Sequence, residues 1–449
     1  MSRPIIHTDI LLKFIRTGAR ARAEKLLDRI HPADIATLLG KLRPAEAREL
    51  IDLLFSSRQA GKTLSELPSE MIPSFLELLS DEQLAQILGR VAPDDAILLL
   101  DALDVTRQAR VIPLIDPTRR AELDRLLRYE PGTAGNVMTP RFLALERTAT
   151  AQEAIDAIRT LGEQVEAVFY LYVVDQKGRL EGVVPIRRLV ASPPDRSLEE
   201  IMMPDPVSVP PDASQEQVAN VVARYNLLAV PVTDPDGRLL GMITVDDVID
   251  VIQEEATQDM YRLAGLDEED RVFSPIRTSV RKRIPWTAIN LGTAFLSASV
   301  VGLFEGTIAQ NATLAVFMPV VAGLGGNVGS QTLTVITRGI ALGEFEFERT
   351  FRVILKNMVI GMTLGTCVGL LAAIIAWLWK SDPAIGLVLF LAMIANMAIA
   401  GIVGAAVPVI LKRLKKDPAL GGSVLITALT DSFGFLCFLG LAHLILGIF

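Results

Sequence analysis

The sequence predicts a multidomain protein with an N-terminal all-α superhelical domain, an α/β tandem repeat, a connecting helix and a five-helix α transmembrane domain. Its 449 residues exceed the length of one ordinary domain. Charge is segregated: residues 285–449 hold nine Lys/Arg and seven Asp/Glu, a net charge of +2, and the whole chain carries −8, so residues 1–284 carry −10. Residues 137–250 also repeat themselves. We therefore expect an acidic, water-exposed front part followed by a membrane domain.

Residues 1–130 are expected to be helical throughout. Proline-led helix starts recur at 31–34 (HPAD), 43–46 (RPAE) and 92–95 (APDD), each followed by apolar residues at spacings of three and four. Short antiparallel helices stacked as a superhelix fit this pattern best. The first residues lack a continuous apolar segment and a cleavage signal, so we expect the chain to start in the cytoplasm.

Residues 131–250 contain two copies of one pattern, with a period of about sixty residues. Residues 137–140 (VMTP) are echoed by 201–204 (IMMP), and 150–155 (TAQEAI) by 213–218 (ASQEQV). Each copy predicts a helix, a strand, a glycine turn, a second strand and a closing helix. The repeat resembles a tandem pair of CBS domains, a module that commonly binds adenine nucleotides or ions.

The connecting segment is strongly acidic. Residues 246–270 contain ten acids and one base, and Asp246, Asp250 and Glu254 are spaced four apart. Like charges at that spacing destabilise a helix by about 0.2–0.5 kcal/mol per pair. Divalent cations bridging the carboxylates would remove this repulsion, and oxygen-only ligands favour magnesium or calcium over zinc or copper. A solvated acidic face is the alternative interpretation.

Five apolar segments predict membrane-spanning helices at about 285–304, 313–336, 351–379, 384–411 and 421–449. Each reaches the length of about 20 residues that crosses a bilayer. Basic residues precede the first segment at 281–283, and others surround the loops between segments two and three and between four and five. The positive-inside rule then predicts a cytoplasmic N-terminus and an external C-terminus.

Asp431 lies about ten residues into the last segment, about 15 Å from its cytoplasmic end at 1.5 Å per residue. A carboxylate at that depth costs at least about 2.5–3.5 kcal/mol unless it faces water or a partner. Thr427 adds a hydroxyl one helical turn below it. Asp431 is therefore expected in an ion pathway; the alternative is a structural carboxylate bonded to a neighbouring helix.

The second segment contains Pro319 and then a glycine-rich run at residues 323–331. We expect this run to interrupt the helix, because proline removes a backbone hydrogen bond and glycine weakens the rest. Broken backbone at membrane depth can meet an ion in a water-filled cavity. Asn327 and Gln331 are four apart and share a face. Packing of small residues between helices is the alternative.

Several classes of function are excluded by composition and motifs. The acidic front part argues against nucleic acid as a partner, because phosphate binding needs clustered Lys and Arg. Three histidines, His7, His31 and His443, are scattered, so no catalytic constellation is present and an enzyme is not expected. The two cysteines lie in apolar stretches, which predicts neither a disulfide framework nor a zinc site.

The whole chain resembles the MgtE family of magnesium channels. The resemblance rests on residues 126–140 (LLRYEPGTAGNVMTP), 254–265 (EEATQDMYRLAG), 325–331 (GGNVGSQ) and Asp431, in this order. It implies an N-terminal domain (1–130), a CBS pair (131–250), a connecting plug helix with its linker (251–284) and a pore domain (285–449). It also implies a homodimer in the inner membrane of the cell, with a pore lined by the second and fifth spans in which Asp431 holds hydrated magnesium.

The resemblance further implies that intracellular magnesium closes the pore by binding to the acidic N-terminal domain, CBS pair and plug helix. The expected pore residues are Asp431, Asn327, Gln331 and Thr427. The expected sensor residues are Asp94, Asp95, Glu216, Asp246, Asp247, Asp250, Glu254, Glu255 and Asp259.

The chain departs from the expected sensor pattern at three neutral positions. Gln258 stands where an acid is expected in the plug helix, and Ser214 and Asn226 are neutral in the second CBS copy. We therefore expect a sensor that holds fewer ions or responds at higher magnesium. ATP as a regulator is left open because of Arg187 and Arg188. The rival functions are a secondary transporter of divalent cations such as Mg²⁺ and Co²⁺, and a membrane-tethered sensor that conducts nothing.

Overall fold

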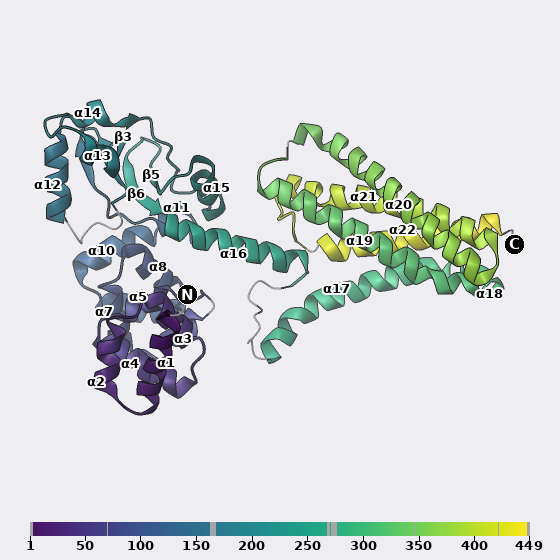
Figure 1. The fold of residues 1–449 in the computed structure, drawn as a ribbon, viewed down its shortest axis with the longest axis horizontal. Coiled ribbons are helices and arrows are strands. Elements are labelled where there is room, and N and C mark those ends of the chain that lie inside the picture. Colours follow the sequence, from purple (N-terminus) through teal and green to yellow (C-terminus); the bar gives the residue numbers. More distant parts are fainter. Residues whose placement is uncertain are drawn as a thin grey trace. The chain divides into compact units, whose positions relative to one another are not determined.

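A computed structural model describes residues 3–69, 71–161, 168–266, 270, 276–345, 347–420 and 422–446. The chain divides into two compact units, Met1–Gln253 and Glu254–Phe449, and each is described by itself (Figure 1). The predicted architecture of an all-helical N-terminal domain, a sheet-containing CBS pair and an apolar helical domain is confirmed. The domain boundaries expected from the sequence stay predictions.

The first unit begins with short stacked helices (Figure 1). They are α1 (Arg3–Arg16), α2 (Arg20–Leu27), α3 (Pro32–Leu39), α4 (Pro44–Ser56), α5 (Ala60–Ser65), α6 (Ile72–Leu76), α7 (Asp81–Leu88), α8 (Pro93–Asp101), α9 (Val105–Val111), η1 (Ile112–Leu114) and α10 (Pro117–Leu126). The three proline-led starts predicted from the sequence open α3, α4 and α8. Proline fits there because the first helical residue needs no amide hydrogen for the helix.

Two arginines each tie a helix of this stack to the end of the third α-helix before it and to the loop that follows that end. Arg119, 7% exposed, donates hydrogen bonds from Nε to the Leu88 carbonyl (3.2 Å) and from Nη2 to the Val91 carbonyl (2.7 Å). Arg107 donates to the two carbonyls that lie 31 and 28 residues before it, the same spacing as for Arg119. Because the last carbonyls of a helix have no partner within it, these guanidinium groups cap helix ends and fix the stacking.

The CBS pair contains two small sheets. Its elements are α11 (Ala134–Val137), β1 (Ala144–Glu146), α12 (Ala151–Leu161), β2 (Tyr170–Val174), β3 (Leu180–Pro185), α13 (Ile186–Ala191), α14 (Leu198–Ile201), β4 (Met203–Pro204), α15 (Gln215–Tyr225), β5 (Ala229–Thr233) and β6 (Leu239–Thr244). One sheet has the order β1-β2-β3-β4, with β1 and β2 parallel, and the other pairs β5 with β6. The predicted helix-strand-strand-helix pattern is present in both copies.

The repeated motifs at 137–140 and 201–204 each pack against the other copy of the repeat. A Cβ atom on Gly182 of the first copy would lie 2.6 Å from Met202 Sδ, and one on Gly241 of the second copy 2.8 Å from Met138 Sδ. Only glycine leaves room for these methionines. Each motif therefore packs on a strand of the other copy, which makes the two copies one folded pair.

Helix α16 (Val245–Leu263) runs without interruption from the last CBS strand through the acidic segment. It carries the predicted acids at helical spacing, and it crosses both the expected boundary at residue 250 and the division between the two compact units at Gln253. The CBS pair and the connecting segment therefore share one helix.

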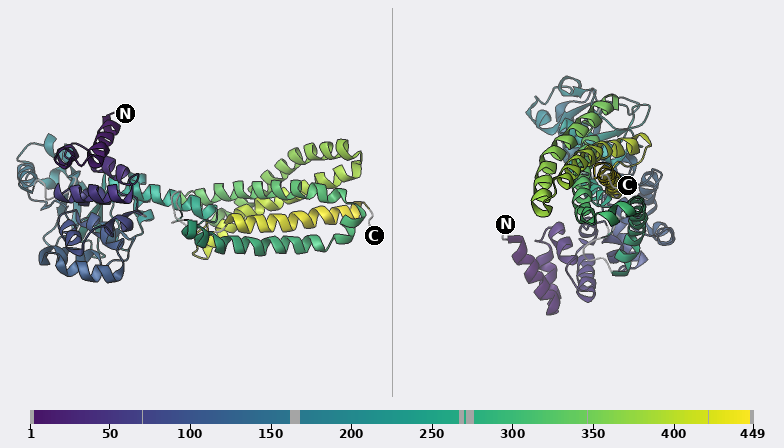
Figure 2. Two further views of the ribbon diagram at one scale, coloured as in Figure 1. Left: turned by 90° about the horizontal axis from the view of Figure 1, so that it is seen from below. Right: turned by 90° about the vertical axis from the view of Figure 1, so that its right-hand side faces the viewer.

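The second unit is built from long apolar helices. They are α17 (Ile276–Gly302), α18 (Glu305–Gln310), α19 (Thr313–Ala341), η3 (Phe347–Arg349), α20 (Thr350–Lys380), α21 (Pro383–Arg413) and α22 (Gly422–Ile445). Within the described residues, five of these helices are long and apolar enough to cross a membrane, as predicted. Helix α21 packs on α19, α20 and α22, while α17 lies along α22 (Figure 2). The loop expected after the first span contains the short helix α18.

The expected break in the second span is wrong, because α19 is one continuous helix of 29 residues that includes Pro319 and the glycine run. Two of its glycines, Gly325 and Gly329, are close-packing positions instead, whereas a Cβ atom on Gly323 would meet open space. A Cβ atom on Gly325 would lie 2.3 Å from Asn396 Nδ2, and one on Gly329 2.4 Å from Ile426 Cγ2. Small-residue packing therefore explains the run, and a helix at membrane depth keeps its backbone groups paired where a loop would not.

Candidate ion pathway and sensor surface

Helix α19 has one buried face and one polar, exposed face. The glycine side, including Gly325 and Gly329, is covered by neighbouring helices, whereas Asn327, Gln331 and Thr334 are exposed. The expected placement of Asn327 and Gln331 on one face is confirmed by the continuous helix. A polar stripe on a membrane-spanning helix needs water or a partner chain, because lipid cannot satisfy amides and hydroxyls.

Helix α22 carries Asp431 at a half-buried position. Within the described part of the chain, its carboxylate makes no hydrogen bond and no ion pair, so the alternative of a structural carboxylate bonded to a neighbouring helix gains no support. Thr427, exposed, donates back to the Ser423 carbonyl at 2.9 Å. The side chain after Asp431, Ser432, shares a hydrogen bond of 3.1 Å with Ser297 of α17.

The glycine run brings these two polar positions to the same depth. A Cβ atom on Gly326 would lie 3.9 Å from Thr430 Oγ1, so α19 and α22 touch at these two residues. Asn327 follows Gly326, and Asp431 follows Thr430. The helices run antiparallel, since Gly329 meets Ile426, so the amide and the carboxylate lie one residue to either side of the point where the two helices meet.

The expected sensor acids are distributed over two helices of the soluble part and the connecting helix. Asp94 and Asp95 lie in the first turn of α8, Glu216 lies in the first turn of α15, and Asp246, Asp247, Asp250, Glu254, Glu255 and Asp259 lie on α16. No three acidic, histidine or cysteine side chains come together as a metal-binding group in the part of the chain that the structure describes. The assignment of these acids to a sensor stays a prediction.

Two of the α16 acids interact with each other electrostatically. Desolvation by the surrounding atoms, followed by the negative charge of Asp246, raises the pKa of Asp250 above its ordinary value. Asp247 is engaged differently, because its Oδ2 accepts a hydrogen bond of 2.6 Å from Thr244. A cation placed beside Asp246 and Asp250 would lower the pKa of Asp250 again, since it favours the charged form.

A polar contact at the end of α16 was missed by the sequence reasoning. Arg262 forms an ion pair with Asp417 in the loop between α21 and α22, and its Nη2 also donates to Gln258 Oε1 at 3.1 Å. The next residue, Leu263, packs against the apolar cluster of Leu333 and its neighbours. The position that we expected to be acidic, residue 258, thus supports an arginine. The sequence did indicate such a contact, because Arg262 is the one basic residue in the acidic segment at 246–270.

A second missed contact concerns Asp270, one of the ten acids of the connecting segment. Its carboxylate, 2% exposed, accepts hydrogen bonds of 2.7 Å from Ser279 Oγ and from Arg283 Nε. These bonds, from Ser279 first and then Arg283, hold the pKa of Asp270 below its usual range. This acid therefore anchors the start of α17.

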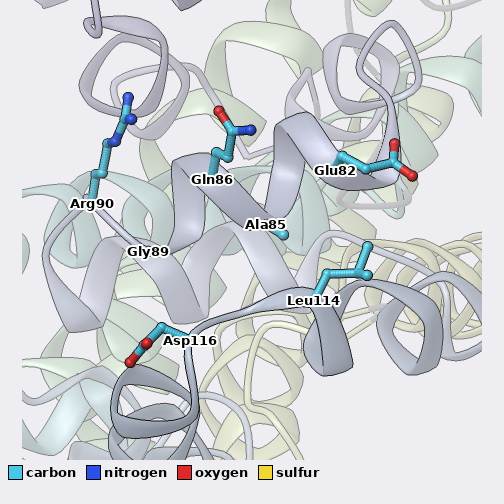
Figure 3. Close-up of a pocket in the computed structure, with 7 residues that line it drawn as sticks. All are labelled: Glu82, Ala85, Gln86, Gly89, Arg90, Leu114 and Asp116. Carbon is cyan, nitrogen blue, oxygen red and sulfur yellow. The ribbon is translucent and has the colours of Figure 1, made fainter.

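One open depression of about 400 Å³ lies in the N-terminal domain (Figure 3). It is lined by Glu82, Ala85, Gln86, Gly89, Arg90, Leu114 and Asp116. Its charged side chains are of both signs, and none of the predicted site residues lines it. We assign it no role in ion binding.

Comparison with known proteins supports each part of this architecture. Residues 318–441 match the family model described as MgtE divalent cation transporter, residues 30–132 match the MgtE intracellular N domain, and residues 134–194 and 198–254 match CBS domains. A solved structure of the cytosolic domain of the Mg²⁺ channel MgtE in complex with ATP is 35% identical, with a TM-score of 0.51, and covers 54% of this chain and 99% of its own.

Two relatives are named magnesium transporters. The magnesium transporter MgtE of Enterococcus faecalis is 35% identical over 61% of this chain and 60% of its own length. The magnesium transporter MgtE of Thermus thermophilus is 35% identical over 97% of this chain and 98% of its own length. Because this similarity spans nearly the whole of both proteins, the chain belongs to the MgtE family of magnesium transporters and is a multi-pass membrane protein.

Proposed function

We propose that this protein is a Mg²⁺-selective channel that admits magnesium across the cell's inner membrane and closes when intracellular magnesium is high. The working unit is a homodimer with cytoplasmic N-termini and external C-termini. Basic residues at 281–283 and 412–416 support this orientation by the positive-inside rule. The exposed polar stripe of α19 supports a second copy, because lipid would leave it unsatisfied.

The observation that carries the proposal is the half-buried Asp431, whose carboxylate has no partner among the described residues, on a helix that packs against α19. Magnesium sheds its water reluctantly, so a pathway that binds the hydrated ion suits it better than a cage of direct ligands. One Asp431 carboxylate from each copy, with Asn327, Gln331 and Thr427 nearby, offers acceptors for the hydrogens of the bound water molecules. Two facing carboxylates also favour a divalent over a monovalent cation.

Closure follows from the acidic soluble part. Asp246, Asp250 and Glu254 repeat at helical spacing on α16, and the pKa of Asp250 is raised by desolvation and then by the negative charge of Asp246. Intracellular Mg²⁺ binding between these acids and those of α8 and α15 would neutralise the repulsion and stabilise the closed conformation. The contact of Arg262 with Asp417 gives α16 a direct connection to the ends of the membrane helices.

ATP is included in the proposal as a regulator bound by the CBS pair. The support is the cytosolic domain of a relative at 35% identity, solved in complex with ATP. Arg187 and Arg188 lie in the first turn of α13 in the CBS pair. They are the cationic side chains because of which the sequence left ATP binding open. ATP binding to the purified chain, measured by calorimetry with and without Mg²⁺, tests this part separately.

The decisive experiment is patch-clamp recording from the protein in liposomes while Mg²⁺ on the cytoplasmic side is stepped from low to high millimolar. We expect unitary Mg²⁺ currents that vanish as internal Mg²⁺ rises, and no current from Asp431→Ala at equal protein amount. Flux without unitary events would identify a secondary transporter of divalent cations. Normal flux through Asp431→Ala would remove Asp431 from the pathway.

A further inference from the structure

Asn396 is a fully buried amide in the middle of the apolar helix α21. Its exposed fraction is 0%, and its Nδ2 donates a hydrogen bond of 2.8 Å to the Val321 carbonyl of α19. Its Oδ1 is buried and has no partner among the described residues. An apolar side chain would fill this place without an unpaired polar atom, which costs about 1–3 kcal/mol when buried. The amide therefore calls for a role beyond filling space.

Two glycines from different helices enclose the Asn396 amide. A Cβ atom on Gly325 of α19 would lie 2.3 Å from Nδ2, and one on Gly434 of α22 would lie 2.7 Å from the same atom. Both distances are shorter than real Cβ contacts, so only glycine permits the approach on either side. The side chain thus lies in a slot between two backbones and contacts both helices of the candidate ion pathway.

The slot lies on the face of α19 opposite Asn327 and next to Asp431 on α22. Gly325 precedes Asn327 by two residues, which turns Asn327 to the opposite face of α19, and Gly434 follows Asp431 by three, which makes them neighbours on α22. The hydrogen bond to Val321 fixes α19 along its axis, since a slip of one residue would move it by about 1.5 Å. Asn396 therefore sets the positions of Asn327 and Asp431 relative to each other along the axes of the two helices.

We propose that Asn396 is a positioning residue for magnesium selectivity, which holds α19 and α22 in register so that Asn327 and Asp431 address one hydrated ion. The proposal rests on the proposed function, in which Asp431 lines the pathway. Asn396 does not touch the ion; it acts through the two helices that it contacts.

The test uses the full chain in liposomes, with Mg²⁺ and Ca²⁺ fluxes measured from the same vesicles. Asn396→Leu keeps the branched shape of the side chain, with bulkier methyl groups, and removes the amide, and Asn396→Ala is the second variant in case leucine prevents folding. The matched control is Asn357→Leu, because Asn357 is half-buried and its Nδ2 bonds only to the Val353 carbonyl of its own helix. We expect the Asn396 variants to lower the Mg²⁺-to-Ca²⁺ flux ratio and raise the half-saturating Mg²⁺ concentration, each by about threefold or more.

The outcomes separate positioning from mere stability. A purely structural role would lower the amount of folded protein and both fluxes in proportion, with an unchanged flux ratio and half-saturating concentration, and that result would overturn the proposal. An equal change of the ratio in Asn357→Leu would also overturn it. Asp431→Ala measured in parallel tests the pathway itself. If Asp431→Ala conducts nothing while both Asn396 variants match the native protein, the assignment of Asn396 fails and the proposed function stands.

Discussion

The ion pair between Arg262 and Asp417 allows the closest quantitative test of the proposed control of the membrane domain by α16. Arg262→Met keeps the length and the apolar stem of the side chain but removes its charge. Asp417 then keeps a carboxylate that is only 26% exposed without its cation. If this pair belongs to the closed conformation, the substitution favours the open one, and more internal magnesium is needed for closure.

The magnitude follows from the burial of the pair. The two side chains are 23% and 26% exposed, which places them between surface pairs worth about 0.2–1 kcal/mol and buried pairs whose disruption costs about 3–5 kcal/mol. We take the contribution of the pair to the closed conformation as about 1.5 kcal/mol, which changes the open–closed equilibrium constant about tenfold. The half-closing magnesium concentration then rises about tenfold if one ion drives closure and about threefold if two do.

The assay is the open probability of single channels against internal magnesium concentration. Arg413→Met is the matched control, because Arg413 ends α21, is exposed and has no ion pair among the described residues. The exchanged pair Arg262→Asp with Asp417→Arg is expected to recover most of the shift. An unchanged half-closing concentration in Arg262→Met, or an equal shift in Arg413→Met, would refute the reasoning.

Three further predictions follow from other contacts. Arg119→Met removes two helix caps from a buried side chain and is expected to cost about 2–4 kcal/mol of stability, read as a lower thermal midpoint of the first unit. Gly329→Leu drives a side chain into Ile426 and is expected to abolish Mg²⁺ flux, whereas Gly323→Leu, whose Cβ meets open space, retains it in the same flux assay. Hydrogen bonds from two arginines lower the pKa of Asp81, so its stabilising contribution is complete above its ordinary pKa of about 3.9 and is lost as pH falls through the folded-state value. Asp81→Asn should remove this part of the acid dependence of unfolding; an unaltered profile would contradict the assignment.

Features with a local signal were predictable from the sequence. The proline-led starts of α3 and α8, the paired CBS copies and five apolar segments each depend on spacing within a few tens of residues. The pattern of charged and apolar residues along the chain predicts these elements without information on which residues are neighbours in space. Asn327 and Gln331 were placed on one face for the same reason.

Features that depend on distant neighbours were misread or missed. The glycine run of α19 weakens a helix only where nothing packs against it, and here Asn396 and Ile426 occupy the space that the absent side chains leave. Arg262 and Asp417 are 155 residues apart, so no local pattern links them. Asn396 could have been recognised in the sequence, because an amide within an apolar span needs a hydrogen-bond partner. The sequence does not show which helix provides that partner.

Gln258 offers a test of the departure from the expected sensor pattern. In the native chain its neutral oxygen accepts a hydrogen bond from Arg262 at 3.1 Å. Gln258→Glu would place a carboxylate four residues before that arginine, the favourable order for a helical ion pair worth about 0.3–0.5 kcal/mol. It would also add a second carboxylate beside Asp417 for a bridging cation. We therefore expect magnesium to protect the chain from proteolysis at a lower midpoint.

The control for this change is Gln253→Glu, which adds the same charge to the same helix at an exposed position. If the two substitutions move the protection midpoint equally, the effect is one of general charge, and residue 258 has no special part in the sensor. If only Gln258→Glu lowers it, the prediction that the native glutamine raises the magnesium concentration needed for a response is confirmed. The Arg262 contact would then be the feature that holds α16 in place where a bound ion is lacking.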